Sequence, residues 1–204
     1  MNIKKSTYHH GNLREVLISS ALEILREGTL QDLSLRALAR KAGVSQTAPY
    51  RHFEDKEALI VVLMQEGSTL LQDSMRVACE NSDEPVDRLI NLGLAYYDFS
   101  QLHPAHFRLM FGGSLECKEK YSELVETEQK GGEIVKFVVN ECMKLPHAPE
   151  VSPDIVRLTC WSLVHGLANL ILNDVIQDDI LKGDDKRTVV SQVISFYTRS
   201  MFEK

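Results

Sequence analysis

The chain has 204 residues, of which 44% are hydrophobic and 25% charged, with only 6 Pro and 11 Gly, a composition that excludes a disordered or collagen-like protein. Its net charge of −6 excludes a uniformly basic nucleic-acid coat, but residues 1–56 hold nine Lys/Arg against six Asp/Glu, a net +3, which leaves −9 for the remainder. A basic head on an acidic body is typical of an anion-binding module joined to a domain that avoids polyanions, although ordinary solvated surface explains the same counts.

Cysteine spacing and hydropathy bear on the compartment. The four cysteines are scattered without a C-x-x-C pair, so neither a zinc finger nor a compact disulfide framework is expected. The longest uninterrupted apolar run, residues 58–64, is far shorter than the roughly 20 residues of a membrane-spanning helix. We therefore expect a reduced, cytoplasmic protein that does not enter a membrane.

The first three predicted helices are short. Apolar residues at helical spacing predict a helix over 13–25. Ser34 is placed to cap a second helix, which Gly43 ends because glycine accepts a left-handed backbone. A third helix is predicted from Ser45, its cap, to about Phe53.

Asp55 is placed to cap a long fourth helix, and Pro and Gly residues separate the helices that follow. The predicted later segments are 55–78, 86–97, 107–111, a charged helix that begins near Glu116, 155–176 and 189–201. With no convincing strand, the sequence predicts an all-α fold of about nine helices. Residues 1–56 form a three-helix head and residues 57–204 a larger helical body.

Residues 34–53, SLRALARKAGVSQTAPYRHF, have the pattern helix, tight glycine turn, helix. This geometry presents a second helix to the major groove of DNA. Ala39 allows close approach of the two helices, Gly43 makes the turn and Val44 anchors the second helix. The residues left for solvent are rich in groups that bond phosphates or base edges: Ser45, Gln46, Thr47, Ala48, Tyr50, Arg51 and His52. A generic helical hairpin is the alternative.

Three segments of the head, 9–14 (HHGNLR), 39–45 (ARKAGVS) and 50–59 (YRHFEDKEAL), closely resemble the N-terminal domain of the tetracycline-repressor (TetR) family of bacterial transcription regulators. In the body, residues 161–168 (WSLVHGLA) resemble the Trp-His-Gly signature of one C-terminal subclass of that family, and residues 103–108 fit it too. The resemblance implies that residues 1–56 form a helix-turn-helix DNA-binding domain and residues 57–204 an effector-binding and dimerisation domain.

The resemblance also implies the roles of individual head residues toward double-stranded DNA. Tyr50, His52 and Lys56 match positions that contact phosphates, and Lys56 also lies at a helix N-terminus, which favours an anion. Ser34 and Ser45 cap helices and can also bond phosphates through a hydroxyl or a free amide.

Base reading is assigned to the turn and the helices that flank it. Gln46, Thr47 and Ala48 match the base-reading face, since Gln bonds adenine and Thr or Ala touches a thymine methyl, and Arg36 matches a position that can bond guanine. Each of these side chains is alternatively plain surface. The chain departs from the family at Ala48-Pro49, where the family commonly has a pair such as Thr-Leu; proline fixes the backbone and removes an amide, which bears on the orientation of the recognition helix.

The body is expected to supply dimerisation and a ligand cavity. A single helix-turn-helix buries little surface, so we expect a homodimer through the last two helices, 155–176 and 189–201, on a pseudo-palindromic operator; the alternative is that these helices only fill the monomer core. A cavity for a small apolar or aromatic effector is expected among side chains that otherwise simply pack in the core: Tyr96, Phe99, Phe107, Met110, Phe111, Trp161, His165 and Asn169.

Other function classes find little support in the residues. No nucleophile with its base, no paired carboxylates and no glycine loop in a phosphate-binding context is present, so no enzyme activity and no cofactor is expected. His103 and His106 are the best candidate metal pair, but no third ligand is evident and no metal is expected. The expected function is a homodimeric repressor released from DNA by a small molecule; the alternative is a helix-turn-helix regulator that acts through protein partners without a ligand.

Overall fold

The computed structural model describes residues 13–113, 115, 120–176 and 185–203. This part of the chain holds eight α-helices, one 3-10 helix and no strand, which confirms the predicted all-α fold. The elements are α1 (Leu13–Glu27), α2 (Leu35–Lys41), η1 (Pro49–Arg51), α3 (Lys56–Glu80), α4 (Pro85–Leu102), α5 (Pro104–Phe111), α6 (Ser122–Cys142), α7 (Pro153–Leu172) and α9 (Lys186–Phe202). The leader at 9–12, the predicted helix start near Glu116 and the acids at 178, 179 and 184 lie outside the described residues.

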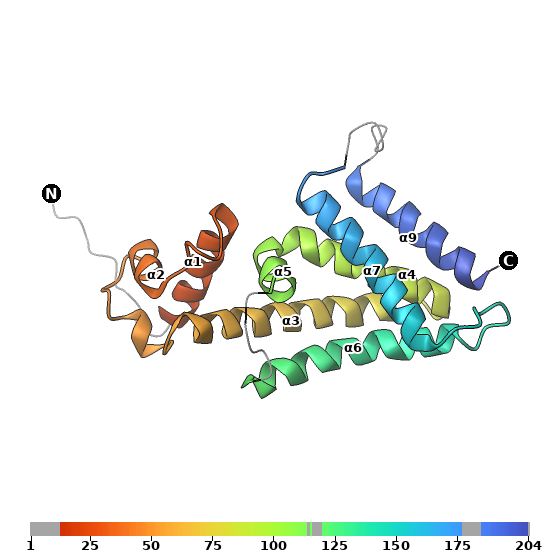
Figure 1. Ribbon diagram of the computed structural model, residues 1–204, viewed down its shortest axis with the longest axis horizontal. Coiled ribbons are helices and arrows are strands. Elements are labelled where there is room, and N and C mark those ends of the chain that lie inside the picture. The colour runs from red at the N-terminus through yellow and green to blue at the C-terminus, as the bar shows by residue number, and fades with distance from the viewer. Residues whose placement is uncertain (1–12, 114, 116–119, 177–184, 204) are drawn as a thin grey trace.

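The head is formed by α1, α2, η1 and the first turn of α3 (Figure 1). Its small core joins Leu17 of α1, Leu38 of α2, Phe53 after η1 and Leu59 of α3, all of them buried. Leu38 precedes the glycine turn and Phe53 follows it, so the turn is held in place by burial of apolar side chains on both sides of it.

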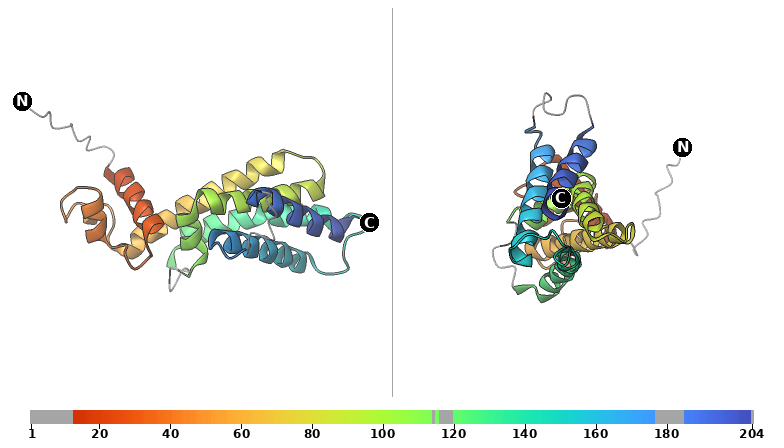
Figure 2. Two further views of the ribbon diagram at one scale, coloured as in Figure 1. Left: turned by 90° about the horizontal axis from the view of Figure 1, so that it is seen from above. Right: turned by 90° about the vertical axis from the view of Figure 1, so that its right-hand side faces the viewer.

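Helix α3 runs from the head into the body without interruption (Figures 1 and 2). Its 25 residues extend about 37 Å at 1.5 Å per residue. In the body α3 packs against α4, α5 and α6, while α4 is central and also packs against α7 and α9. Helix α5 contacts α1 as well, so the body touches the head at a second place besides α3.

Helix starts follow the signals in the sequence. Asp55 caps α3 by accepting from the amide of Ala58 at 2.8 Å, as predicted, and Asp185 caps α9 by accepting from the amide of Thr188 at 3.0 Å. Pro occupies the first position of α4, α5 and α7, where its missing amide costs nothing.

The predicted helix over 155–176 ends earlier, at Leu172. Asp174 there has a φ of 54°, in the left-handed region, and the amide of Val175 returns to the carbonyl of Leu170 at 2.9 Å. The predicted helix was too long because the apolar pattern in the sequence continues past the last helical residue.

Helix α7 is the one helix in the described part of the chain that is long and apolar enough to cross a membrane. An 18-residue window of this helix has a mean hydropathy of 1.5, and 22% of the window is buried. Here it packs against α4, α6 and α9, as a helix of a globular domain does.

Candidate functional site

The glycine turn of the head has the geometry that the sequence predicted. Ser34 caps α2 by accepting from the amide of Ala37 at 3.1 Å. Gly43 has a φ of +67°, and the following amide of Val44 donates to the carbonyl of Ala39 at 3.0 Å. The chain thereby reverses within two residues of the end of α2 and brings the next segment across it.

The segment after the turn is not the α-helix predicted from Ser45. It consists of a turn followed by the 3-10 helix η1, Pro49–Arg51. Pro49 has no amide hydrogen and cannot donate to the carbonyl of Ser45; the amide of Ala48 does so instead, at 3.0 Å. The Ser45 hydroxyl lies 3.3 Å from that of Thr47 rather than capping a helix. The Ala48-Pro49 departure thus changes the local backbone.

The turn and η1 present a polar surface to solvent. Pro49 and Phe53 are buried and fix the segment to the core, while Tyr50 is 53% exposed. Of the predicted DNA contacts, Ala48 and Lys56 are half-buried, and the remaining seven are exposed: Ser34, Arg36, Ser45, Gln46, Thr47, Tyr50 and His52. Arg51, which the sequence already places among the exposed polar groups after the turn, and Arg40, which it does not, are exposed on the same part of the chain and add two cations to it.

Two lysines of the head already have partners within the chain. Lys56 Nζ donates to the carbonyl of Leu30 at 2.6 Å, so it ties α3 to the loop between α1 and α2. An ammonium group has three donors, and two remain for a phosphate. Lys41 pairs with Glu27 at 2.9 Å and Glu23 at 3.4 Å, which fixes the end of α2 to α1.

The body contains a large cavity between α3, α4, α5, α6 and α7. Its volume is about 930 Å³, which is enough for a drug-sized molecule. Among the described residues, fifteen line it: Ser68, Leu71, Gln72, Met75, Tyr96, Met110, Phe111, Glu128, Gly131, Gly132, Val135, Asp154, Arg157, Leu158 and Trp161.

Five of the predicted effector residues form one aromatic cluster beside this cavity. Tyr96 packs edge-on against Phe107 at 5.8 Å between ring centroids, and Phe107 lies 5.0 Å from Phe111. His165 joins the cluster at 5.3 Å from Phe111 and 5.6 Å from Trp161. Tyr96, Phe111 and Trp161 line the cavity, as Met110 does. Phe107 and His165 are not part of the lining but pack against these aromatic rings.

A chain of hydrogen bonds orders the polar atoms of this cluster. Trp161 Nε1 donates to Tyr96 Oη at 3.3 Å, and Tyr96 Oη lies 2.8 Å from His165 Nδ1. Asn169 Nδ2 contacts His165 Nε2 at 3.0 Å and donates to the carbonyl of His165 at 2.8 Å. Burial raises the pKa of Tyr96 and lowers that of His165, so both side chains are uncharged at neutral pH.

The prediction for Phe99 is not supported by its position. Phe99 packs against His103, at 5.4 Å between ring centroids, and lines a separate hollow of about 290 Å³ with His103 and Arg187. Helical spacing accounts for this, because a residue three positions after Tyr96 is rotated by about 60° around α4.

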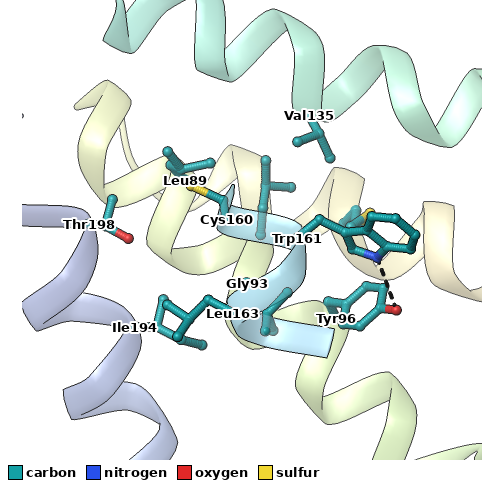
Figure 3. A pocket seen from close by; sticks show the side chains of 12 residues that line it. Leu89, Gly93, Tyr96, Val135, Cys160, Trp161, Leu163, Ile194 and Thr198 are labelled. Carbon is teal, nitrogen blue, oxygen red and sulfur yellow. Dashed lines mark hydrogen bonds between the residues drawn. The ribbon is translucent and has the colours of Figure 1, made fainter. Parts of the chain in front are cut away.

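A smaller hollow of about 60 Å³ adjoins the cavity and shares Met75, Tyr96, Val135 and Trp161 with it. Figure 3 shows the Trp161–Tyr96 hydrogen bond on one side of this hollow and Ile194 and Thr198 of α9 on the other. Its volume suits a water molecule or two rather than a ligand.

Several cavity residues were missed in the sequence. Ser68, Gln72 and Arg157 are ordinary helix residues, and nothing in their spacing marks them. The pair Gly131-Gly132 in the middle of α6 carried a signal, since each glycine in a helix interior costs about 1 kcal/mol relative to alanine. An added Cβ on Gly132 would meet nothing within 4 Å, so the wall is open there, whereas one on Gly131 would lie 3.1 Å from Gln72 Cγ, so Gly131 allows the close approach of α6 to α3.

His103 and His106 lie side by side, with ring centroids 5.9 Å apart. Among the described residues, no group of three or more His, Cys, Asp or Glu side chains is placed to hold a metal ion. His106 Nε2 is buried and has no hydrogen-bond partner in the described part of the chain, and burial lowers the pKa of His106 to about 4.

Comparison with known proteins decides the family. Residues 17–63 match the family model for bacterial regulatory proteins of the tetR family, and residues 89–187 match that for the tetracyclin repressor-like C-terminal domain. The chain belongs to the TetR family of bacterial transcription regulators. Within this TetR-family chain, the two matches place the glycine turn in the N-terminal domain and most of the cavity in the C-terminal one.

Individual relatives and solved structures are similar to the chain along most of its length. An uncharacterised HTH-type transcriptional regulator of Bacillus subtilis, YobS, is 25% identical over 85% of this chain and 87% of its own length. A protein of unknown function from Rhodococcus sp. RHA1 has a similar structure, with a TM-score of 0.79, 28% identity, and 98% of this chain and 100% of that chain covered. A tetR-family regulatory protein from Rhodococcus RHA1 has a TM-score of 0.77 at 16% identity, over 94% and 97% of the two chains.

Proposed function

We propose that this TetR-family regulator is a cytoplasmic homodimeric repressor that leaves its operator when a small, mainly apolar molecule fills the cavity in the body. Residues 1–56 serve as the DNA-binding domain and residues 57–204 as the effector-binding and dimerisation domain. The observation that carries the proposal is the single helix α3, which lines the cavity through Ser68 and Leu71 and begins in the head at Lys56.

The surface of the head supports binding of double-stranded DNA. Exposed hydroxyl, amide and guanidinium groups suit phosphates and base edges, and Tyr50 and His52 flank them for phosphate contact. Two such heads in a dimer read half-sites separated by about one helical turn or a multiple of it, which explains why a pseudo-palindromic operator is expected.

The outer surface of α7 and α9 supports dimerisation. These helices pack side by side (Figure 1), and they expose Ile155, Leu158 and Leu170 of α7 and Phe196 of α9, the last of which is 78% exposed. Exposed apolar side chains gathered on neighbouring helices are typical of a subunit interface. The Trp-His-Gly subclass resemblance stays a prediction.

The packing of α5 supports coupling between the cavity and the head. Met110 and Phe111 of α5 line the cavity, and the same helix contacts α1 of the head. At Gly67 of α3, an added Cβ would lie 2.8 Å from both His106 Cβ and Met110 Sδ, so the two helices touch with no spare room. A ligand that displaces α5 therefore shifts α3 or α1 with it, and two states of the head follow from two positions of α5.

The proposal is tested by selecting fragments of the organism's genome on the purified protein and footprinting the ones that bind. The expected result is a protected pseudo-palindrome with two half-sites, occupied by an even number of protomers. Compounds that occupy the cavity are then added to the complex. If compounds bind at saturation and operator affinity does not change, the cavity does not regulate DNA binding.

A further inference from the structure

The hydrogen bonds around Tyr96 specify a donor that faces the cavity. Asn169 contacts the carbonyl of His165, which can only accept, so the amide group on that side of Asn169 is its NH₂. The same NH₂ lies 3.0 Å from His165 Nε2, so Nε2 must accept. The proton of the neutral imidazole is therefore on Nδ1.

This tautomer fixes the role of the Tyr96 hydroxyl. His165 Nδ1–H donates to Tyr96 Oη at 2.8 Å, and Trp161 Nε1–H, which can only donate, reaches the same oxygen at 3.3 Å. Both lone pairs of the phenol oxygen are thus filled. Its own proton has no acceptor among the described residues, although Tyr96 is 97% buried, with a relative exposure of 3%, and lines the large cavity.

A second residue that lines this cavity also has a polar group without a partner. Ser68 Oγ of α3 is buried, with 3% of the residue exposed, and it has no hydrogen-bond partner in the part of the chain that the structure describes. Ser68 lines the same cavity as Tyr96. A buried polar group that lacks a partner is uncommon because it costs about 1–3 kcal/mol, so the unpaired Ser68 Oγ and the Tyr96 proton without an acceptor, both in one cavity, point to a ligand that pairs with them.

The charges around the cavity select an uncharged partner. Of the described residues that line it, Arg157 is the one cation, and its Nη2 is paired with Asp154 at 3.1 Å. Glu128 and Asp154 are the two acids on the described lining, and Glu128 has a partner of its own as well. Each charged side chain on this lining is thus already paired, so a carboxylate or an ammonium ligand would lose its hydration without meeting an unpaired counter-charge.

We propose that the ligand of this cavity is a mainly apolar molecule with an uncharged hydrogen-bond acceptor, a ketone, ester or amide carbonyl, which accepts from Tyr96 Oη, with Ser68 Oγ as a further hydroxyl without a partner on the same lining. This inference names the ligand class for the regulator proposed above and rests on that function for its biological meaning. The carbonyl supplies the acceptor that the Tyr96 proton lacks, and the aromatic cluster and Leu71, Met75 and Leu158 surround the apolar part.

Intrinsic fluorescence tests the inference without DNA, because Trp161 is the only tryptophan of the chain and lines the cavity. The probes are cyclododecanone, cyclododecylamine and cyclododecanecarboxylate, which share one saturated ring and differ in the polar group. Each is titrated into the full-length protein. The ketone is expected to bind at least about fivefold more tightly than the amine and the carboxylate, as one additional neutral hydrogen bond provides.

Matched variants separate the hydrogen bond from general packing. Tyr96→Phe keeps the ring and is expected to weaken ketone binding about fivefold to tenfold, with little effect on the amine. Tyr97→Phe makes the same chemical change at a buried neighbour that does not line the cavity, and it leaves all three affinities unchanged. Ser68→Ala is expected to weaken ketone binding by a smaller factor.

The inference is overturned if the carboxylate or the amine binds as tightly as the ketone, if Tyr96→Phe leaves ketone affinity unchanged, or if no probe alters the fluorescence of Trp161. Operator binding by the ligand-free protein is measured separately on the same samples. Loss of that binding would refute the proposed function, whereas the probe affinities alone decide the ligand class.

Discussion

Replacement of Phe196 by alanine tests the proposed subunit interface at its most exposed apolar side chain. Phe196 is 78% exposed, and a phenylalanine buries about 150–250 Å² when it is covered, so roughly 150 Å² is open to a partner. At about 25 cal/mol per Å² this area is worth about 4 kcal/mol, of which alanine loses about 3 kcal/mol per protomer. Each dimer contains two copies.

Association also costs ordering entropy, and so only part of this free energy reaches the dimer affinity. We expect Phe196→Ala to weaken dimerisation by at least about 2 kcal/mol, a factor of about 30 in the dissociation constant. Sedimentation velocity over a concentration series measures this constant directly. Operator affinity is expected to fall with it, because a monomer holds only one half-site.

Phe137→Ala is the matched control. Phe137 is 57% exposed and belongs to α6 rather than to α7 or α9, and its loss is expected to leave the dimer intact. Equal dissociation constants for wild type and Phe196→Ala, or an equal effect of the two variants, would refute the assignment of the interface to α7 and α9.

Three further predictions concern other parts of the molecule. Gly132→Leu places a side chain at the open wall of the cavity, so probe binding followed by Trp161 fluorescence should be lost while operator affinity is kept; retained probe binding would show that the cavity extends elsewhere. Ser34→Ala removes the cap of α2 and should lower the free energy of unfolding by about 1 kcal/mol, measured by urea denaturation; an unchanged midpoint would mean that the cap contributes nothing. Burial lowers the pKa of His106 from 6.5 to about 4 in the folded protein, so below pH 6.5 the unfolded chain binds a proton there that the folded protein does not. The stability contributed by neutral His106 is therefore fully present above pH 6.5 and is lost as pH falls toward 4. In urea titrations the neutral variant His106→Gln should lose less stability over this window than wild type; parallel curves would contradict the lowered pKa.

Much of the fold was predictable because its signals are local. Caps at Ser34 and Asp55 and the left-handed Gly43 each act within one turn of helix, and the structure has them where the sequence predicts them. The segment from Ser45 was mispredicted because Pro49 removes one amide, and apolar anchors on both sides still hold the shorter turn in place.

The cavity was predictable only in part. Aromatic side chains such as Tyr96 and Trp161 are conspicuous in a sequence, and the structure does bring them together. Ser68 and Arg157 became identifiable only from tertiary packing, because it is the crossing of α3, α6 and α7 that leaves space beside them. Phe99 shows the opposite error, since its chemistry fits a cavity but its position on α4 faces another hollow.

The most direct test of the account is operator binding by fluorescence anisotropy over a series of salt concentrations, with wild type and Gln46→Ala. The account predicts that affinity for the selected operator falls steeply with salt, and that Gln46→Ala reduces discrimination between operator and random duplex by about 1–3 kcal/mol while binding to random duplex stays nearly the same. If wild type binds the operator no more tightly than random DNA, or if Gln46→Ala discriminates as well as wild type, the exposed turn of the head does not read sequence.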